Sequence, residues 1–480
     1  MKKALLRLLL SCSIINIGSF EDAKLCASTN AAVHDFTRRG NDIGGALGES
    51  LFIWLPENST LNVTSSLYVP ESVTLVLNVS NVTVCPGCSV FVEGELKFSR
   101  SVEVRAWSTE YADWEGIKFV GNNKEDVSLG HVKLFNCRVC LMFCNARHVY
   151  LNDTNLVGYH REKSAILLNG TYAGDLSLAL RNVSLFGDNG VWMTTAQSLI
   201  SSLNCGRSNS SRISISIHDS RLRSKHWHIV HRMPSVADDC QKKRYLVDLR
   251  RSSFHSSGAR GGIQVWGRGR PLKRGLKAFI DNCTFSSSYE GHISNYPVKL
   301  DDVESVEVRT SNFNVTFLDL GFSRNVELCQ VVNSSFDALG SSGPNVKLLG
   351  PSDSAARCYL ASNQFTIGLS PVIVSESDSM SLILRNNSFE NGSLASIRPF
   401  TIHSWCVINA GTKANSSHVR LDARQNWWGA SNLSELARRV CDTSQNPLTS
   451  GVLLSPHYTT SLKDTLRYPS ERNNPNSYRG

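Results

Sequence analysis

The sequence predicts an all-β fold in which short strands coil into a parallel β-helix, a solenoid with a cap at each end. Three observations support this prediction: one strand-and-corner pattern recurs along the chain, a second apolar strand follows many copies, and no helical periodicity separates them. A unit that repeats every roughly 20 to 50 residues is typical of a solenoid. A pair of β-sandwiches would explain the alternation of apolar residues, but not a corner residue at a fixed offset.

The recurring pattern reads apolar, any, apolar, any, small polar, two of any kind, and a closing apolar residue. In the copy that begins at Leu382, Leu384 is the second apolar residue, Asn386 is the small polar residue and Phe389 closes the copy. Alternation at period two predicts a strand with one buried face. The eleven copies begin at Val132, Val149, Leu178, Ile215, Val247, Ala278, Val306, Cys329, Cys358, Leu382 and Leu421.

The small polar residue marks a corner of each coil, because Asn and Asp tolerate left-handed backbone and bond to nearby backbone groups. It lies two residues after the second apolar residue, so strand alternation would place its side chain on the same side of the strand as the two apolar side chains. We therefore expect its side chain to point inward and to form a bonded ladder with its counterparts. Arg251 is the one basic residue at this position, and we expect any break of the ladder there. Asparagine forms the corner at Asn136, Asn182, Asn282, Asn333 and Asn386.

One solenoid accounts for residues 28–460, because each coil pairs only with its neighbours and the ends need caps. We expect an N-terminal cap over about 28–60 and coils from about 61 onward, whereas residues 461–480 form a polar tail that is expected to be disordered. The second apolar strands are predicted at Ile166–Leu168, Val191–Met193, Ile263–Val265, Val346–Leu348 and Val372–Val374.

Several features predict a secreted, extracellular protein. Residues 1–19 resemble a signal peptide, with Lys2 and Lys3 before an apolar run that Arg7 interrupts. That run is too short to span a membrane, and no later apolar run is long enough, so no transmembrane segment is expected in this chain. The 14 cysteines and 15 Asn-x-Ser/Thr sequons agree with an oxidising, glycosylating route.

The corner assignment also sorts the sequons, because a glycan cannot be accommodated in the solenoid interior. The sequon asparagines predicted to stay unmodified are Asn182, Asn282, Asn333 and Asn386. The candidates for glycans are Asn58, Asn62 and Asn152.

Cys329 and Cys358 occupy the same position of consecutive copies, and stacked strands place such Cα atoms about 5 Å apart. We predict a disulfide between them; the alternative is two buried free thiols. The Cys85-Pro-Gly-Cys88 segment precedes a predicted strand instead of a helix, which favours a local turn or disulfide over a redox site. Disulfides are likewise favoured over a zinc site for Cys137, Cys140 and Cys144.

The sharpest charge feature is the segment 241–277, which holds eleven basic residues against one acid in a chain of net charge +9. A glycine-rich basic loop with an aromatic residue could bind an anionic partner, and for an exported protein that partner would be an acidic glycan and not nucleic acid. The alternative is a solvated loop. The predicted anionic-ligand patch comprises Arg260, Trp266, Arg268, Arg270, Lys273, Arg274 and Lys277.

No catalytic site, metal or cofactor is predicted. The acidic pairs Asp238-Asp239 and Asp301-Asp302 lack the spacing of the pectin-cleaving β-helix enzymes, and acidic doublets in loops are usually solvated. The histidines of the segment 226–231 have no acidic or cysteine partner at an obvious offset, so packing or surface roles are favoured.

Three segments carry a family resemblance. Val73–Leu96 resembles the opening coils of extracellular right-handed parallel β-helix proteins, Trp114–Phe119 is similar to the W-x-G-I-x-F step that follows, and Leu421–Gly429 resembles a closing A-x-x-N-W-W-G signature. This ordered set resembles the ectodomain of the Bark beetle (Anakonda) family, which implies a right-handed solenoid at epithelial cell contacts and supplies no catalytic residues. The expected function is therefore non-catalytic cell adhesion, junction or matrix scaffolding with an extracellular partner. An acidic-glycan-binding or polysaccharide-cleaving protein is the alternative.

Overall fold

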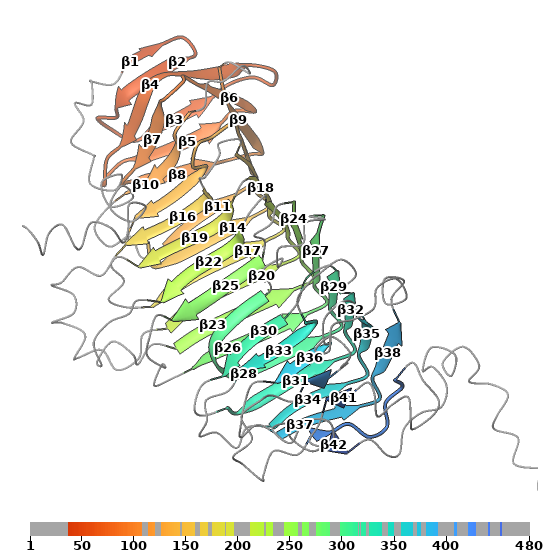
Figure 1. Cartoon of the computed structure of the whole chain (residues 1–480). Helices are drawn as coiled ribbons and strands as arrows, with labels where there is room; N and C mark the ends of the chain where they lie inside the picture. The colour runs from red at the N-terminus through yellow and green to blue at the C-terminus, as the bar shows by residue number, and fades with distance from the viewer. Residues whose placement is uncertain are drawn as a thin grey trace, which may run out of the picture. The chain divides into compact units, whose positions relative to one another are not determined.

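The computed structural model confirms the all-β parallel β-helix (Figure 1). It describes residues 37–391 with gaps, together with residues 408–409, 421–428, 440–441 and 452–453. The gaps are 108–113, 121–125, 145, 159–163, 171–174, 188, 196–211, 225–226, 234–243, 258–261, 268–274, 289–297, 315, 317, 323–325, 338–343, 350–356, 368–371 and 376–380. The chain divides into two compact units, Met1–Arg244 with Val265–Arg270, and Tyr245–Gln264 with Pro271–Gly480.

The first unit begins with a hairpin of β1 (Thr37–Arg39) and β2 (Asp42–Ala46), and β2 already pairs in parallel with β4 (Thr60–Val69). Parallel coils therefore start within the segment expected to be the cap. Strands β3 (Leu51–Trp54), β5 (Thr74–Asn78) and β8 (Glu95–Phe98) form a small separate sheet.

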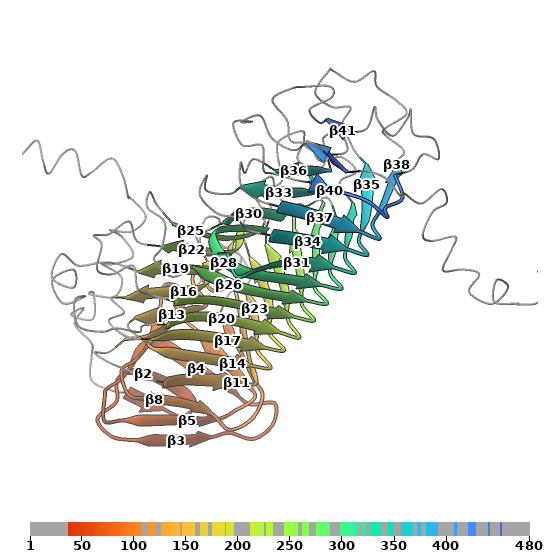
Figure 2. The ribbon, with the colours of Figure 1, turned by 90° about the horizontal axis from the view of Figure 1, so that it is seen from below.

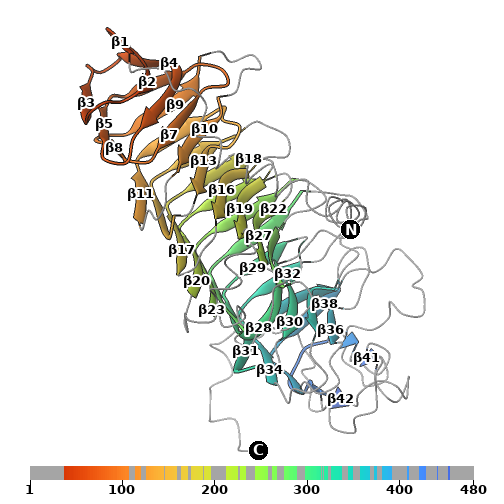
Figure 3. The same ribbon diagram turned by 90° about the vertical axis from the view of Figure 1, so that its left-hand side faces the viewer.

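The remaining strands of the first unit stack in three parallel columns; Figure 3 shows β13, β16 and β19 side by side. The first column holds β11 (Asp126–Gly130), β14 (His148–Asn152), β17 (Leu176–Arg181) and β20 (Arg212–His218). The second holds β6 (Asn81–Val84), β9 (Val102–Ala106), β12 (Val132–Phe135), β15 (Asn155–Val157), β18 (Ser184–Gly187) and β21 (Arg221–Ser224). The third holds β7 (Ser89–Val92), β10 (Gly116–Phe119), β13 (Leu141–Cys144), β16 (Ser164–Gly170), β19 (Asn189–Thr195) and β22 (Trp227–Met233).

The second unit repeats these columns (Figure 2). Its first column holds β23 (Arg244–Arg250, whose first residue belongs to the other unit), β26 (Leu276–Asp281), the end of β28 (Val298–Arg309), β31 (Leu328–Val332), β34 (Arg357–Ala361), β37 (Ser381–Arg385) and β40 (Leu421–Asp422). Its second holds β24 (Ser253–Ser256), β27 (Thr284–Ser287), β29 (Asn312–Asn314), β32 (Ser335–Asp337), β35 (Gln364–Ile367) and β38 (Ser388–Asn391). Its third holds the start of β28, then β30 (Leu318–Phe322), β33 (Val346–Leu349), β36 (Ile373–Ser375), β39 (Ile408–Asn409) and β41 (Val440–Cys441). The final strand, β42 (Val452–Leu453), pairs with β40.

Each predicted second strand corresponds to an observed strand of the third column, or to β25 (Gly262–Gly267). The closing apolar residues of the second unit lie in register from coil to coil. They form one buried aromatic column in which successive ring centroids lie 4.5 to 5.1 Å apart. The column comprises Phe254, Phe285, Phe313, Phe336, Phe365, Phe389 and Trp428.

The predicted corner residues turn the chain, but their side chains do not point inward. Asn182, Asn282, Asn333 and Asn386 have φ of 51° to 53° and are exposed. A residue with left-handed backbone interrupts the alternation of inward and outward side chains. The residue after the corner therefore points into the core instead. The prediction that the corner side chains form an internal ladder is therefore wrong, and so is its reason for excluding glycans from these four asparagines. One bond between corner side chains does exist on the outside of the first unit, where Asn182 Nδ2 donates to Asp153 Oδ1 at 2.5 Å.

The internal ladder exists one position later in the second unit, and it consists of hydrogen bonds between coils. The backbone N–H of Ser334 donates to Asn363 Oδ1 at 2.9 Å, that of Asn363 donates to Asn387 Oδ1 at 2.9 Å, and that of Asn387 donates to Asn426 Oδ1 at 2.8 Å. All these residues are buried. The column of ladder residues comprises Ser252, Cys283, Ser311, Ser334, Asn363, Asn387 and Asn426.

Asn136 does not belong to the same corner as the other four asparagines. Strand β11 pairs with β14 so that Leu129 lies beside Leu151, which makes His131 the counterpart of Asp153. His131 has a φ of 57°, and its N–H donates to Asn152 O at 3.2 Å. The copy of the pattern predicted to begin at Val132 is thus out of register with the other copies. It lies on β12, which belongs to the second column, whereas the corner follows strands of the first column.

Arg251 does not interrupt the corner. Its φ of 46° matches that of the other corner residues. Its backbone N–H donates to Asp281 O at 3.0 Å, just as Asn282 donates to Arg309 O in the following coil. The backbone bond between coils needs no particular side chain, so a basic residue occupies this position without a break.

The predicted Cys329–Cys358 disulfide is present and joins β31 to β34, where the two residues lie in direct register. Cys85–Cys88 and Cys137–Cys140 are also disulfides, and Cys144 is disulfide-bonded. Among the described cysteines Cys283 is free. It occupies a ladder position, and burial raises the pKa of its thiol to about 11.

Candidate functional site

The outer side of the first column in the second unit carries two rows of residues that are mostly charged toward both ends and uncharged in the coils of β31 and β34 between them. Alternation along each strand places every second side chain outward. Strand pairing then sets these side chains in register from coil to coil. One row runs through Asp248, Phe279, Glu307, Gln330, Tyr359, Ile383 and Asp422, and the other through Arg250, Asp281, Arg309, Val332, Ala361 and Arg385, with Arg424 just beyond β40. We call these two rows the charged face.

At one end of the charged face, two arginines share an aromatic ring. Arg250 Nε donates to Asp248 Oδ1 at 2.8 Å, and its guanidinium carbon lies 4.7 Å from the centre of the Phe279 ring. The Arg309 guanidinium lies 5.8 Å from the same centre and forms an ion pair with Glu307. Cation–π contact of this kind orders the guanidinium groups.

The carboxylates of this group lie below the guanidinium groups. The side chains of Asp248 and Glu307 are 17% and 18% exposed, whereas those of Arg250 and Arg309 are 42% and 49% exposed. The hydrogen bond that Arg250 donates to Asp248 is the main reason that the pKa of Arg250 is raised. The surface offered to a partner is thus formed by ordered guanidinium groups.

At the other end, Asp422 accepts hydrogen bonds from two arginines. Arg424 Nη2 lies 2.8 Å from Asp422 Oδ2, and Arg385 Nη1 lies 2.6 Å from Asp422 Oδ1. These bonds, first from Arg424 and then from Arg385, hold the pKa of the Asp422 carboxyl well below its usual range. Arg424 is the more exposed of the two arginines.

The sequence contains a signal for this face that is separate from the repeating corner pattern. An acid, an apolar residue and an arginine follow one another in Asp248–Arg250, Glu307–Arg309 and Asp422–Arg424. On a strand, residues i and i+2 lie on the same face, so each tripeptide forms its own ion pair around a buried apolar residue. The same motif at Glu103–Arg105 forms an ion pair in the first unit.

The predicted anionic-ligand patch lies largely beyond what the structure describes. Arg260, Arg268, Arg270, Lys273 and Arg274 are outside the described residues, and Trp266 lies in β25 without a described side chain. Lys277 is described, on β26. Its Nζ lies 2.5 Å from Glu327 Oε2 and 3.8 Å from Glu304 Oε1, so its charge is neutralised by acids.

The Asp301-Asp302 pair lies on β28, at a bulge between Leu300 and Val303. Burial is the main reason that the pKa of Asp301 is raised, and the charge of Asp319 on β30 adds to it. The carboxylate packs close to the backbone of Gly321, where an added Cβ would lie 3.0 Å from Asp301 Oδ1. No group of His, Cys, Asp and Glu among the described residues could hold a metal ion.

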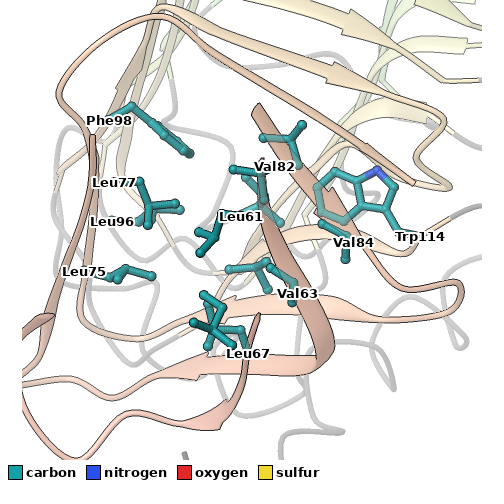
Figure 4. Close-up of a pocket in the computed structure, with 14 residues that line it drawn as sticks. Leu61, Val63, Leu67, Leu75, Leu77, Val82, Val84, Leu96, Phe98 and Trp114 are labelled. Atoms are coloured by element: carbon teal, nitrogen blue, oxygen red, sulfur yellow. The ribbon is translucent and has the colours of Figure 1, made fainter. Parts of the chain in front are cut away.

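The first unit contains a small apolar cavity between its opening coils (Figure 4). Its free space is about 20 Å³, which is close to the volume needed for one water molecule. Leu61, Val82 and Trp114 are among the fourteen lining residues, all of which are apolar. The Trp114 Nε1–H donates to Phe135 O at 2.9 Å. The cavity therefore offers no polar group to orient a ligand, and we interpret it as a packing defect.

The motifs that carry the family resemblance serve the core. Gly116 has a φ of 103°, and an added Cβ would lie 1.7 Å from Val139 O, so only glycine can occupy this position. Trp114 is buried beside it. Asn426 is the last described residue of the ladder, and Trp428 is the last described residue of the aromatic column.

The glycan candidates Asn58, Asn62 and Asn152 all have exposed or half-buried side chains. Asn58 lies in the turn before β4, where its φ is 69°. Asn62 Nδ2 donates to Asp42 Oδ1 at 2.8 Å, and Asn152 Nδ2 donates to Asp153 Oδ2 at 2.7 Å. Glycosylation of these residues stays a prediction.

Within the described part of the chain, no helix has the length and apolar character needed to cross a membrane. No protein-family model, curated protein or solved structure matches the chain in comparisons with known proteins.

Proposed function

We propose that the chain is a secreted, non-catalytic β-helix protein whose charged face binds another extracellular protein in cell adhesion, a cell junction or matrix scaffolding. One observation carries the proposal: exposed guanidinium groups lie above less exposed carboxylates with which they are paired. Arginine and aromatic side chains held in place beforehand are typical of the energetic centres of protein interfaces.

The balance of charge favours a protein partner over an acidic glycan. The two rows and Arg424 contain four arginines, and the same rows contain four carboxylates, those of Asp248, Asp281, Glu307 and Asp422. A polyanion is bound through an excess of positive charge, which these two rows do not have. In the third outward row of the same strands, Lys277 is paired with Glu327 and Glu304, and Arg357 adds one positive charge. A face that alternates both signs instead gives specificity toward a protein surface with the complementary pattern, including a second copy of itself.

Export is part of this proposal. The disulfides of the described residues are compatible with an oxidising compartment, and the signal-like residues 1–19 and the sequons agree with it. We also propose that the chain is a relative of the Bark beetle family. The support is the resemblance of Trp114–Phe119 and Leu421–Gly429, whose buried residues serve the fold and specify no partner.

The test is a bead-aggregation assay with the full chain coupled to beads. We expect the wild-type beads to aggregate and the R250Q/R309Q variant to aggregate several-fold less, while melting at a similar temperature. The matched control is R221Q, which removes an exposed arginine on β21 of the first unit. Aggregation that is the same in R250Q/R309Q as in wild type would reject the charged face as the binding surface.

The glycan alternative is tested on a heparin column. If the segment 260–274 forms an anionic-ligand site, substitution of Arg268, Arg270, Lys273 and Arg274 by serine should sharply reduce retention at physiological salt. Strong retention of wild type without any bead aggregation would favour the acidic-glycan alternative over adhesion.

A further inference from the structure

The sequon asparagines and the buried asparagines form two separate groups. Ten sequon asparagines have a described burial, and all ten are exposed or half-buried: Asn58, Asn62, Asn78, Asn81, Asn152, Asn182, Asn282, Asn314, Asn333 and Asn386. Four described asparagines are fully buried, and none of them begins a sequon: Asn345, Asn363, Asn387 and Asn426. Each sequon asparagine with a described burial is therefore at least partly open to solvent.

The separation is sharpest at the corner, where exposed and buried asparagines are adjacent in the chain. Asn386 begins the sequon Asn-Asn-Ser and is exposed, whereas Asn387 is buried in the ladder. The residues after Asn282 and Asn333, Cys283 and Ser334, are likewise buried. The left-handed corner therefore directs the sequon asparagine into solvent, although the following residue belongs to the core.

Three of these asparagines occupy the same corner in alternate coils of the second unit. The backbone bonds Asn282 N to Arg309 O, Asn333 N to Ala361 O and Asn386 N to Gln425 O repeat at this corner. Thr310 and Ser362, which have short side chains, form the corner in the two coils between them. With coils about 4.8 Å apart, alternate corners are about 10 Å apart, which leaves room for one sugar column beside the next.

We propose that Asn282, Asn333 and Asn386 carry N-linked glycans that form a row along this corner of the second unit. The proposal rests on the export part of the proposed function. It also restricts that function, because each glycan follows directly after a strand of the charged face: Asn282 after Asp281, and Asn386 after Arg385. The row lines one margin of the charged face, so a partner has to approach from the opposite margin.

The experiment is glycopeptide mass spectrometry of the full chain secreted from cultured animal cells, with enzymatic removal of N-glycans in heavy-oxygen water. We expect each of the three asparagines to be converted to labelled aspartate. The single variants N282D, N333D and N386D should each reduce the mass of the intact protein by one glycan. Aspartate is the matched substitution. At the same corner in the first unit, Asp153 and Asp219 adopt the left-handed backbone conformation, so an aspartate is compatible with it.

Two outcomes would overturn the row, and they are distinguishable. Glycans at Asn58 or Asn152 with none at the three corner asparagines would reject the row and leave export intact. A chain that stays inside the cell and carries no glycan at any sequon would reject both the row and the extracellular function.

Discussion

At the residue scale, one backbone dihedral decides what each polar residue does. A φ of 53° at Asn386 turns the chain, so that Asn386 faces solvent and Asn387 faces the core. Asn387 then uses its whole amide: Oδ1 accepts from Asn363, and Nδ2 donates to Leu360 O at 2.9 Å and to Asn426 Oδ1 at 2.9 Å. Adjacent residues of the same type therefore have unrelated roles.

Replacement of Asn387 by leucine should destabilise the second unit by at least about 2 kcal/mol, because buried donors and acceptors lose their partners. The N–H of Asn363 and the carbonyl of Leu360 are the groups affected. The measurement is urea unfolding followed by tryptophan fluorescence. The control is N386D at the exposed neighbouring position. An N387L midpoint equal to that of N386D would contradict the ladder.

Asp422 should make stability depend on pH in the acidic range. Its pKa in the folded protein is held far below its usual value by Arg424 and Arg385, so its ionised form stabilises the fold above the unfolded pKa of about 4. That stabilisation is lost as the pH falls below about 4. We expect the melting temperature of D422N to fall less than that of wild type between pH 6 and about pH 3. Parallel curves for the two proteins would contradict the prediction.

At the element scale, each strand has its main partners in the neighbouring coils. The aromatic column illustrates this, since Phe336 lies between Phe313 and Phe365 with ring centroids 4.6 and 5.0 Å away. The Cys329–Cys358 disulfide joins two of the same coils in the first column. In a solenoid, stability is a sum of such contacts between nearest neighbours, so a local defect weakens the coils beside it.

Replacement of Phe336 by alanine should cost about 3 to 5 kcal/mol, because it removes a buried ring and leaves a cavity within the column. The matched control is F186A in the first unit, since Phe186 is 40% exposed and contacts solvent. Thermal melting measured by circular dichroism compares the two. Equal melting temperatures for F336A and F186A would show that the column does not stabilise the second unit.

At the scale of the whole molecule, the chain has a net charge of +9, yet the charged face is balanced. Much of the basic excess lies in the segment 241–277, which contributes Asp248 and Arg250 to the charged face but most of whose basic residues lie outside the described residues. The charged face and this segment of the sequence therefore differ in net charge and favour different partners. This difference is why the bead and heparin experiments can separate adhesion from glycan binding.

The sequence by itself determined the fold class, because period-two alternation and a repeating corner are local properties of the chain. It also predicted the Cys329–Cys358 disulfide, because equal positions in consecutive copies stack directly. The aromatic column was not predicted, although its residues, such as Phe336 and Phe365, close consecutive copies of the pattern. For the charged face, the tripeptides such as Glu307–Arg309 were present in the sequence, but their meaning depended on which side of each strand is outward.

The tertiary structure alone decided which polar residues point inward. If the period-two alternation of the strand continued through the corner, Asn282 and Asn333 would point into the core. The left-handed conformation at the corner instead shifts the inward position by one residue. The tertiary structure also decided which segment is the first described copy of the corner pattern. Strand pairing makes His131, and not Asn136, the counterpart of Asp153. The physical reason is common to both: alternation is fixed within a strand, whereas a turn can reset it, and only the contacts between coils show where that happens.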